Sequence, residues 1–173
     1  IEKLKKSYRS TIEIMNMANH VLSHWDNPHV TLAEPVLRHG DPPEIVGCGS
    51  EVEAMRRIAE RIAALRAQGM FHIAVIEKTA ERCRSVYEQL AALGVSDLHL
   101  IAESASKYEG GVSVVPVYLS KGMEFDAVLL VNPSKASYQP DLPEDIKLLY
   151  VACTRALHRL EAYCWDECSP LLS

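Results

Sequence analysis

The sequence predicts an α/β domain in which a mostly parallel, doubly wound sheet carries helices on both faces. Segments with strand-like and helix-like patterns alternate along the 173 residues, which is the order of βαβ units. The segment from Phe71 to Ile76 is almost continuously apolar, as a strand covered on both faces should be. A chain of this length buries roughly 70% of the surface that it exposes when unfolded. With no internal repeat or long linker, we expect one domain over residues 1–173.

The first part of the chain predicts a helix followed by two short strands. Ser10 and Glu13 have the spacing of a capping box and open a helix that we expect to run to about His24. Two short strands are expected at residues 35–37 and 44–47, joined by a turn rich in Gly and Pro.

A second capping box, at Ser50 and Glu53, opens a longer helix that should end near Gly69. One side of this helix is apolar. Its basic residues are expected to form a solvated face: Arg56, Arg57, Arg61 and Arg66.

The middle of the chain predicts a βαβ unit. The strand at 71–76 is followed by a helix from Thr79 to Leu93, with Gly94 as its left-handed stop, and by a short strand at 98–101.

The last third predicts strands at 112–118 and 127–131, a helix opened by Pro143 and a closing strand at 160–164. Pro116 removes a backbone donor, so we expect the strand that contains it to end there or become irregular. In a sheet of this kind, ligand chemistry is expected at the carboxyl ends of the strands.

Composition limits the function. The net charge is −5, from 18 basic and 23 acidic residues, so nucleic-acid contact should be local. No apolar run approaches the roughly 20 residues that span a bilayer, and we expect no membrane partner. The five cysteines are scattered, which indicates reduced thiols in a cytoplasmic protein. The chain starts at Ile1 without a methionine, and we take it as a domain excised from a larger protein.

Three common site motifs are absent or incomplete. The chain has no GxxxxGK[ST] loop, so by itself it should not hydrolyse ATP. Gly47 and Gly49 begin a dinucleotide-binding fingerprint whose third glycine is missing, and are interpreted as turn glycines. Cys164 and Cys168 with His158 lack the second ligand pair of a zinc site.

The candidate chemistry lies in a charged turn and in a later helix. The turn covers residues 120–126, between two apolar runs, and includes Lys121 and Glu124. Arg155 is expected late on the helix opened by Pro143, about 180° from its apolar stripe and therefore facing outward. Leu148, Val151 and Ala152 fall on the same outward side, which suggests a face that meets a partner.

These segments resemble three motifs of the UvrD-like superfamily 1 helicases, in their second, RecA-like motor lobe. Residues 8–11 resemble motif IV, residues 117–126 with the sequence KGMEF resemble motif V, and residues 148–156 with YVA and TRA resemble motif VI. The three motifs occur in order and the likeness extends from residue 4 to about 164. The segment 71–79 resembles the intervening strand and turn, with Lys78 where an arginine is common.

The resemblance implies a three-layer RecA-like lobe of an ATP-dependent DNA helicase or translocase, without a phosphate loop of its own. ATP and Mg²⁺ would lie between two lobes, with the metal held mainly by the N-terminal lobe. Arg9 and Arg155 would act as catalytic residues on the γ-phosphate. Tyr8 would stack on adenine, while Gly122 and Glu124 would complete the nucleotide contacts, Glu124 at the ribose. The isolated fragment would be inactive.

The resemblance also implies contact with single-stranded DNA through Tyr118 and Lys121. Many relatives have Thr-x-His where this chain has Pro116-Val117-Tyr118. The sequence of this segment resembles more closely the helicase IV and HelD-like branch, whose members bind RNA polymerase and use ATP to free it from nucleic acid.

The sequence is also compatible with two other functions. The chain could be a non-catalytic RecA-like module that docks a protein partner, or a self-contained nucleotide-binding domain that uses Gly47 and Gly49.

Overall fold

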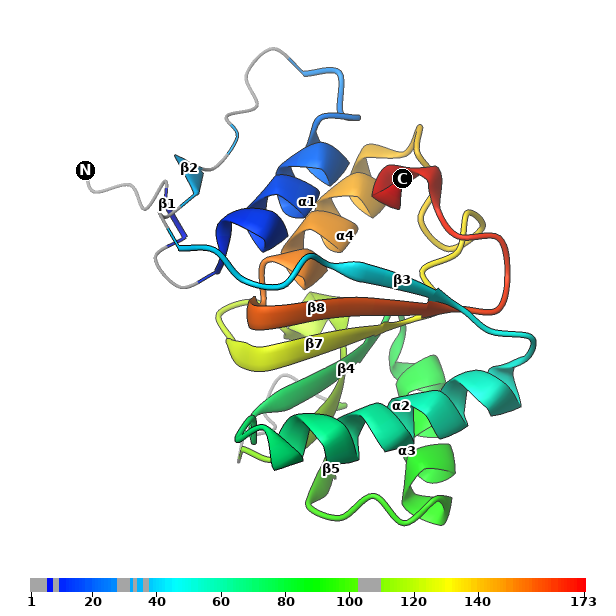
Figure 1. Cartoon of the computed structure of the whole chain (residues 1–173). Helices are drawn as coiled ribbons and strands as arrows, with labels where there is room; N and C mark the ends of the chain where they lie inside the picture. The colour runs from blue at the N-terminus through cyan, green and yellow to red at the C-terminus, as the bar shows by residue number, and fades with distance from the viewer. Residues whose placement is uncertain (1–5, 8–9, 28–31, 33, 36–37, 103–109) are drawn as a thin grey trace.

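The computed structural model contains a twisted parallel sheet between two helical layers (Figure 1). It describes residues 6–7, 10–27, 32, 34–35, 38–102 and 110–173. The main sheet has six strands in the order β3-β8-β7-β4-β6-β5, and every pairing in it is parallel. Its strands are β3 (Glu44–Gly47), β4 (Ile73–Glu77), β5 (Leu98–Leu100), β6 (Val112–Pro116), β7 (Phe125–Val131) and β8 (Ala156–Cys164). A separate two-stranded parallel pair joins β1 (Lys6–Ser7) to β2 (Glu34–Pro35).

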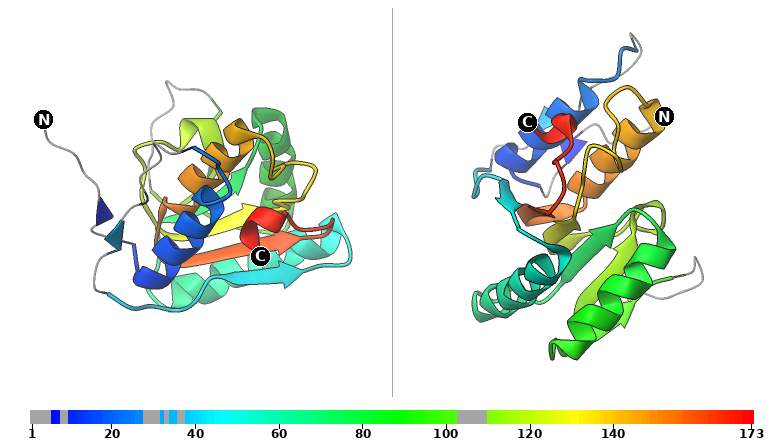
Figure 2. Two further views of the ribbon diagram at one scale, coloured as in Figure 1. Left: turned by 90° about the horizontal axis from the view of Figure 1, so that it is seen from above. Right: turned by 90° about the vertical axis from the view of Figure 1, so that its right-hand side faces the viewer.

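The helices lie in two layers, one on each face of the sheet (Figure 2). α1 (Ile12–Leu22) and α4 (Pro143–Cys153) pack side by side on one face, close to the terminal 3₁₀ turn η2 (Pro170–Leu172). α2 (Glu51–Ala67) and α3 (Ala80–Ala92) cover the other. The fold predicted from the alternation of strands and helices is confirmed. No helix of the described residues is both long and apolar enough to cross a membrane.

Alternate residues of the central strands supply the two hydrophobic cores. In β7, Val128 and Leu130 belong to the core under α1 and α4, while Ala127, Leu129 and Val131 belong to the core under α2 and α3. Because successive strand side chains point to opposite faces, a strand buried on both sides has to be apolar throughout. All five residues of β4 are buried, as expected for such a strand, although Phe71, which we had placed in it, lies outside and is exposed.

The cap of the first helix differs from the expected one. Thr11 is the N-cap residue, and its hydroxyl accepts a hydrogen bond from the Ile14 amide. The Ser10 hydroxyl instead donates to the Ala156 carbonyl oxygen at 2.6 Å, so it ties the start of α1 to the start of β8. The capping box prediction was therefore wrong at this helix. At α2, Ser50 caps the Glu53 amide as predicted, while the Glu53 carboxylate accepts from Gly49.

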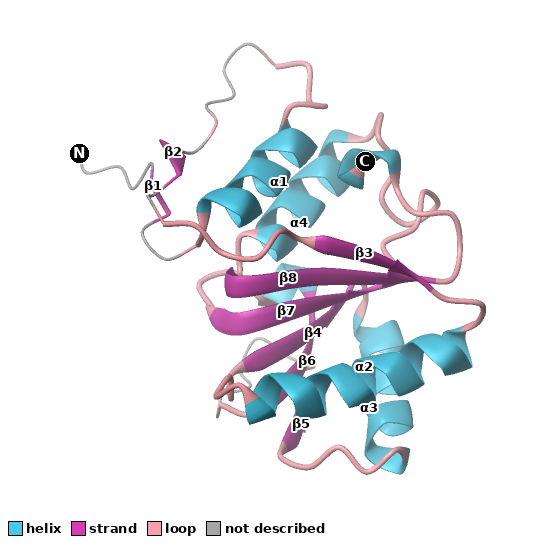
Figure 3. Ribbon diagram, viewed as in Figure 1, coloured by secondary structure: helices cyan, strands magenta, loops and turns pink. Residues whose placement is uncertain are grey.

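The connection from β6 to β7 runs from the carboxyl ends of the strands back to their amino ends, because the two strands run in the same direction. β6, which lies beside β4 in the sheet (Figure 3), ends at Pro116, as predicted, and continues into the 3₁₀ turn η1 (Val117–Leu119). Val117 is fully buried and packs in the core with α1 and α4. The segment between η1 and β7 therefore ends at the amino edge of the sheet.

The last strand is longer than predicted and begins much earlier. α4 ends at Cys153 with Thr154 as its C-cap, and β8 starts at Ala156. Arg155 therefore lies in the turn between them, so the prediction that it extends outward from a helix was wrong. Ala152, also expected to face outward, is fully buried, while Leu148 and Val151 are half-buried against the core.

The outer side of β8 is covered partly by a strand and partly by side chains. β3 pairs only with residues 161–164, the second half of the strand. Beside the first half, the Arg38 guanidinium donates to the Leu157 carbonyl oxygen at 3.2 Å and lies 3.1 Å from His158 Nδ1. Arg159 forms an ion pair with Asp41 at 3.0 Å. Side chains of the segment before β3 thus cover the edge that no neighbouring strand reaches.

One arginine of α2 is not part of a solvated face. Arg61 donates from Nε to both carboxylate oxygens of Glu161, at 2.8 and 3.0 Å, and Glu161 is only 3% exposed. The Tyr163 hydroxyl donates to the same carboxylate at 2.6 Å. Arg61 therefore neutralises a charge buried in the sheet, which the helical pattern alone could not indicate.

Candidate functional site

Arg155 and the motif V-like turn meet at the amino edge of the sheet. The Phe125 amide, at the start of β7, donates to the Arg155 carbonyl oxygen at 2.9 Å. The Arg155 guanidinium donates to the Met123 carbonyl oxygen at 3.2 Å. These residues lie where β7 and β8 begin, at the edge opposite to the carboxyl ends of the strands, where the sequence predicts ligand chemistry.

The turn presents its charged residues to solvent. Lys121, Gly122 and Glu124 are exposed, and Gly122 has φ +83°, a left-handed conformation that favours glycine. Beneath them Ser120 is fully buried, and its hydroxyl donates to the Val117 carbonyl oxygen at 2.7 Å. Tyr118 lies at the start of the same connection with 51% of its surface exposed. A buried hydroxyl thus anchors a turn whose functional candidates face outward.

The Arg155 guanidinium is half-buried and is held by uncharged oxygens. Its Nε donates to the Val151 carbonyl oxygen at 3.1 Å, and one terminal nitrogen lies 3.2 Å from Thr154 Oγ1. Burial lowers the pKa of Arg155, and the negative charge of Glu124 opposes that shift. Because none of these three acceptors is a carboxylate, the positive charge is positioned without being neutralised by them. Thr154 belongs to the motif VI-like segment but was not selected from the sequence as a site residue.

The start of α1 reaches the same edge. Ser10, which follows Arg9 in the chain, donates to Ala156, which follows Arg155. Tyr8 and Arg9 themselves lie outside the described residues. The structure thus brings together Arg155, Glu124, Gly122 and Lys121, with Tyr118 at the start of the same connection.

Comparison with known proteins identifies the family. The model of the UvrD-like helicase C-terminal domain matches residues 111–161, which include the turn and Arg155. The C-terminal domain of a possible DNA helicase from Lactobacillus plantarum WCFS1 is 30% identical, with a TM-score of 0.78 over 96% of this chain and 92% of that one. This chain belongs to the UvrD-like helicase C-terminal domain family.

Other solved structures are more distant from this helicase domain. The helicase nonstructural protein 10 of Arterivirus is 12% identical, with a TM-score of 0.49 over 73% of this chain and 29% of that one. The same protein in complex with DNA gives 12% identity and a TM-score of 0.47, over 70% of this chain and 28% of that one. No curated protein matches the sequence.

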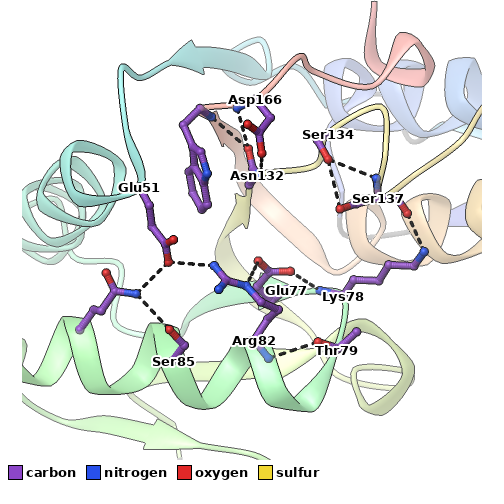
Figure 4. Close-up of polar contacts among 12 residues, drawn as sticks. Glu51, Glu77, Lys78, Thr79, Arg82, Ser85, Asn132, Ser134, Ser137 and Asp166 are labelled. Atoms are coloured by element: carbon purple, nitrogen blue, oxygen red, sulfur yellow. Dashed lines mark hydrogen bonds and ion pairs between the residues drawn. The ribbon is translucent and has the colours of Figure 1, made fainter.

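The carboxyl edge of the helicase domain holds a second polar cluster (Figure 4). Lys78, after β4, forms an ion pair with Asp145 at 2.8 Å and donates to the Ser137 carbonyl oxygen at 2.6 Å. The other Asp145 oxygen accepts from the Gln139 amide at 2.9 Å. Arg82 bridges Glu51 at 2.8 Å and Glu77 at 3.5 Å. Each of these charges therefore has an opposite charge beside it.

A hollow of about 610 Å³ opens beside this cluster. It is lined mainly by polar residues of the loops after β7 and β8: Ser134, Lys135, Gln139, Asp141, Asp166 and Glu167. Within the described part of the chain, no three His, Cys, Asp or Glu side chains group as metal ligands. The hollow and the candidate site lie at opposite ends of the strands.

The glycines of the incomplete dinucleotide fingerprint have local roles. Gly47 ends β3, an edge strand of the sheet. The Gly49 amide donates to Glu53 Oε1 at 2.7 Å, and a Cβ at this position would lie 3.0 Å from the same oxygen. Since Glu53 already occupies that amide, this turn lacks the open donor that a phosphate would use. The geometry therefore favours the interpretation as turn glycines.

Proposed function

We propose that this domain is the second motor lobe of an ATP-dependent superfamily 1 helicase or translocase, and that it closes an ATP site formed with an N-terminal lobe. The observation that carries the proposal is the Arg155 guanidinium, held by uncharged oxygens next to the exposed turn that contains Glu124. A guanidinium held in this way can change partners toward a phosphate without breaking an ion pair in the described structure.

The chemistry of phosphoryl transfer explains why such an arginine matters. The transferring γ-phosphoryl group spreads negative charge over its oxygens, and an arginine supplied from across a cleft stabilises that charge. In this proposal Arg9 and Arg155 reach the γ-phosphate, Tyr8 stacks on adenine, and Gly122 and Glu124 contact the rest of the nucleotide, Glu124 at the ribose. Mg²⁺ belongs to the other lobe, which also supplies the phosphate loop that this chain lacks. Hydrolysis then depends on closure of the two lobes.

The decisive experiment measures ATP turnover in a polypeptide that carries both lobes. Arg155→Lys and Arg155→Ala should each lower kcat by at least about 100-fold, because the contribution of such an arginine is typically 10³–10⁵. Arg56→Ala is the matched control, since Arg56 is an exposed arginine on α2, on the other face of the sheet. Turnover within about threefold of wild type in both Arg155 variants would instead favour a non-catalytic docking module.

We also propose that Tyr118 and Lys121 contact single-stranded DNA. Both side chains are exposed near the same turn, where a base can stack on the tyrosine ring and a phosphate can meet the lysine. Tyr118→Ala and Lys121→Ala should each weaken DNA binding at least about threefold in a fluorescence anisotropy titration. Lys135→Ala, at an exposed lysine in the loop after β7, should leave binding unchanged. Equal loss in all three variants would contradict this interface.

A narrower proposal assigns the parent enzyme to the branch that remodels RNA polymerase. It rests on the motif V-like sequence from Pro116 to Asp126. Association of the two-lobed protein with RNA polymerase on a sizing column, and release of nucleic acid from that complex only with hydrolysable ATP, would support it. An enzyme that unwinds duplex DNA without binding the polymerase would refute it.

A further inference from the structure

The end of α4 lies directly before the proposed catalytic arginine. α4 ends at Cys153, Thr154 is its C-cap residue, and Arg155 occupies the turn before β8. The last carbonyl groups of an α-helix have no amide partner within the helix. If the helix continued, the Arg155 amide would donate to the Val151 carbonyl oxygen, but it donates to the Ala152 carbonyl oxygen at 3.3 Å instead. The Val151 oxygen is therefore left to accept from side chains.

Two side chains donate to that oxygen. The Thr154 hydroxyl donates to the Val151 carbonyl oxygen at 2.9 Å, and Arg155 Nε donates to the same oxygen at 3.1 Å. A terminal nitrogen of Arg155 also donates to Thr154 Oγ1 at 3.2 Å. A hydroxyl has one hydrogen and two acceptor lone pairs. Because its hydrogen points to Val151, the Thr154 hydroxyl presents a lone pair to the guanidinium.

These contacts give each of the three guanidinium nitrogens an acceptor. Nε donates to Val151, one terminal nitrogen donates to the Met123 carbonyl oxygen at 3.2 Å, and the other donates to Thr154. A guanidinium is planar and donates in a fixed fork, so three acceptors define its plane as well as its position. Of the three, Thr154 Oγ1 is the side-chain atom, and a substitution can therefore remove it without changing the backbone.

The same hydroxyl suits the helix end to a change of partner by the arginine. If the guanidinium turns toward a phosphate, the Val151 oxygen loses Arg155 Nε but keeps the Thr154 hydroxyl as a donor. An acceptor that is left without a donor is unfavourable. The retained hydrogen bond thus lowers the cost of moving Arg155.

We propose that Thr154 is a positioning residue for Arg155. Its hydroxyl fixes the guanidinium beside the turn, and it caps the end of α4 when the guanidinium moves onto the γ-phosphate. This inference rests on the function proposed above for Arg155. Since Thr154 acts through the arginine, loss of its hydroxyl should affect hydrolysis only while Arg155 is present.

Kinetics of the polypeptide with both lobes test this dependence. Thr154→Val removes the hydroxyl and keeps the branched shape of the side chain, whereas Thr154→Ser keeps the hydroxyl. Thr154→Val should lower kcat for ATP at least about tenfold with KM within about twofold of wild type, because a misplaced group reduces turnover more than binding. Thr154→Ser should keep kcat within about threefold of wild type. In an Arg155→Ala background, Thr154→Val should lower kcat by less than about twofold.

NMR relaxation follows the arginine in the domain without ATP. The Arg155 Nε–H signal is identified by its loss in Arg155→Lys, and its order parameter reports motion on the ps–ns timescale. This order parameter should be at least about 0.2 higher in wild type and Thr154→Ser than in Thr154→Val. Circular dichroism checks that each variant is folded. Thr154→Ala, which also lacks the hydroxyl, replaces Thr154→Val if the valine variant does not fold.

The outcomes separate this inference from the proposed function. Wild-type turnover in Arg155→Ala would remove the proposed function and the positioning role together. Loss of turnover in Arg155→Ala, with unchanged kcat in Thr154→Val, would overturn only the positioning role. Equal losses in Thr154→Val and Thr154→Ser, the same loss from Thr154→Val with and without Arg155, or an unchanged order parameter would also overturn it.

Discussion

The two edges of the sheet handle charge in opposite ways. At the carboxyl edge, Lys78 is paired with Asp145, and Arg82 joins Glu51 to the buried Glu77. At the amino edge, the Arg155 guanidinium is held by carbonyl and hydroxyl oxygens, and Lys121 and Glu124 lie exposed beside it.

This difference suits a stabilising role for the carboxyl edge and agrees with the function proposed for the amino edge. Ligands of open α/β sheets usually bind at the carboxyl ends of the strands, so position alone would favour that edge here. Its charges, however, already have partners that a ligand would have to displace, and displacing a buried partner is unfavourable. We therefore expect substitutions at the carboxyl edge to affect mainly unfolding, and substitutions at Arg155 to affect mainly turnover.

The largest effect on stability should come from Asp145→Ala. The variant removes the carboxylate that pairs with Lys78 and accepts from the Gln139 amide, and leaves Lys78 only the Ser137 carbonyl oxygen. Loss of one partner of a largely buried pair costs about 3 kcal/mol. Urea unfolding measures this free energy. Asp141→Ala, at an exposed acid nearby, should change it by less than about 0.5 kcal/mol. Equal effects of the two variants would remove the distinction between the edges.

A smaller effect is expected at Gly122 in the exposed turn. A Cβ there would meet no atom within 4 Å, so Gly122→Ala is penalised only by the left-handed backbone, at about 1 kcal/mol. Asn tolerates this conformation better, and Gly122→Asn should be less destabilising than Gly122→Ala. Thermal unfolding of both variants would test the order, and the reverse order would contradict this account of the turn.

Arg155→Ala should change the unfolding free energy by about 1 kcal/mol or less, even though its expected effect on ATP turnover is the largest in the molecule. The reason is that water can hydrate the oxygens that accept hydrogen bonds from Arg155 once the guanidinium is removed. Urea unfolding of the domain provides the measurement. A loss as large as that of Asp145→Ala would make Arg155 a structural residue.

Glu77→Gln should give the smallest effect, visible mainly as a change in pH dependence. Burial raises the pKa of Glu77, against the opposing influence of the Lys78 amide and Arg82. A raised carboxyl pKa stabilises the fold below the unfolded value, about 4.3, and that contribution is lost as pH rises through the folded value. The stability of the variant relative to wild type should therefore rise from pH 4 upward and then level off. A relative stability that falls over this range would show that Glu77 is stabilising as a carboxylate.

Much of the fold could be predicted because its signals are local. The apolar run of β4, the Ser50 cap, the start of α3 next to Thr79 and the stop at Gly94 depend on neighbouring residues, and the structure contains each of them. Errors arose where a distant contact decides the outcome. Ser10 has the sequence context of a helix cap, but its hydroxyl bonds to Ala156.

The residues of the candidate site were selected from the sequence, and the structure corrects the expected position of one of them. Lys121, Glu124 and Arg155 were selected from the sequence, but a helical projection placed Arg155 on a helix that in fact ends at Cys153. The partners that hold it, above all the Met123 carbonyl oxygen, belong to a segment remote in sequence. Backbone oxygens carry no sequence signal, so only the folded chain could reveal them. Tyr8 and Arg9 stay predictions.

The uneven covering of β8 has a consequence for solubility. A long strand with a bare outer side offers a row of amide and carbonyl groups onto which another chain can add. Here β3 protects only residues 161–164, and the Arg38 guanidinium occupies the Leu157 carbonyl oxygen with Asp41 and Arg159 alongside. Charged side chains thus cover the backbone groups with which a further strand would otherwise pair. They hinder the addition of another chain at the end of the sheet nearest the proposed catalytic arginine.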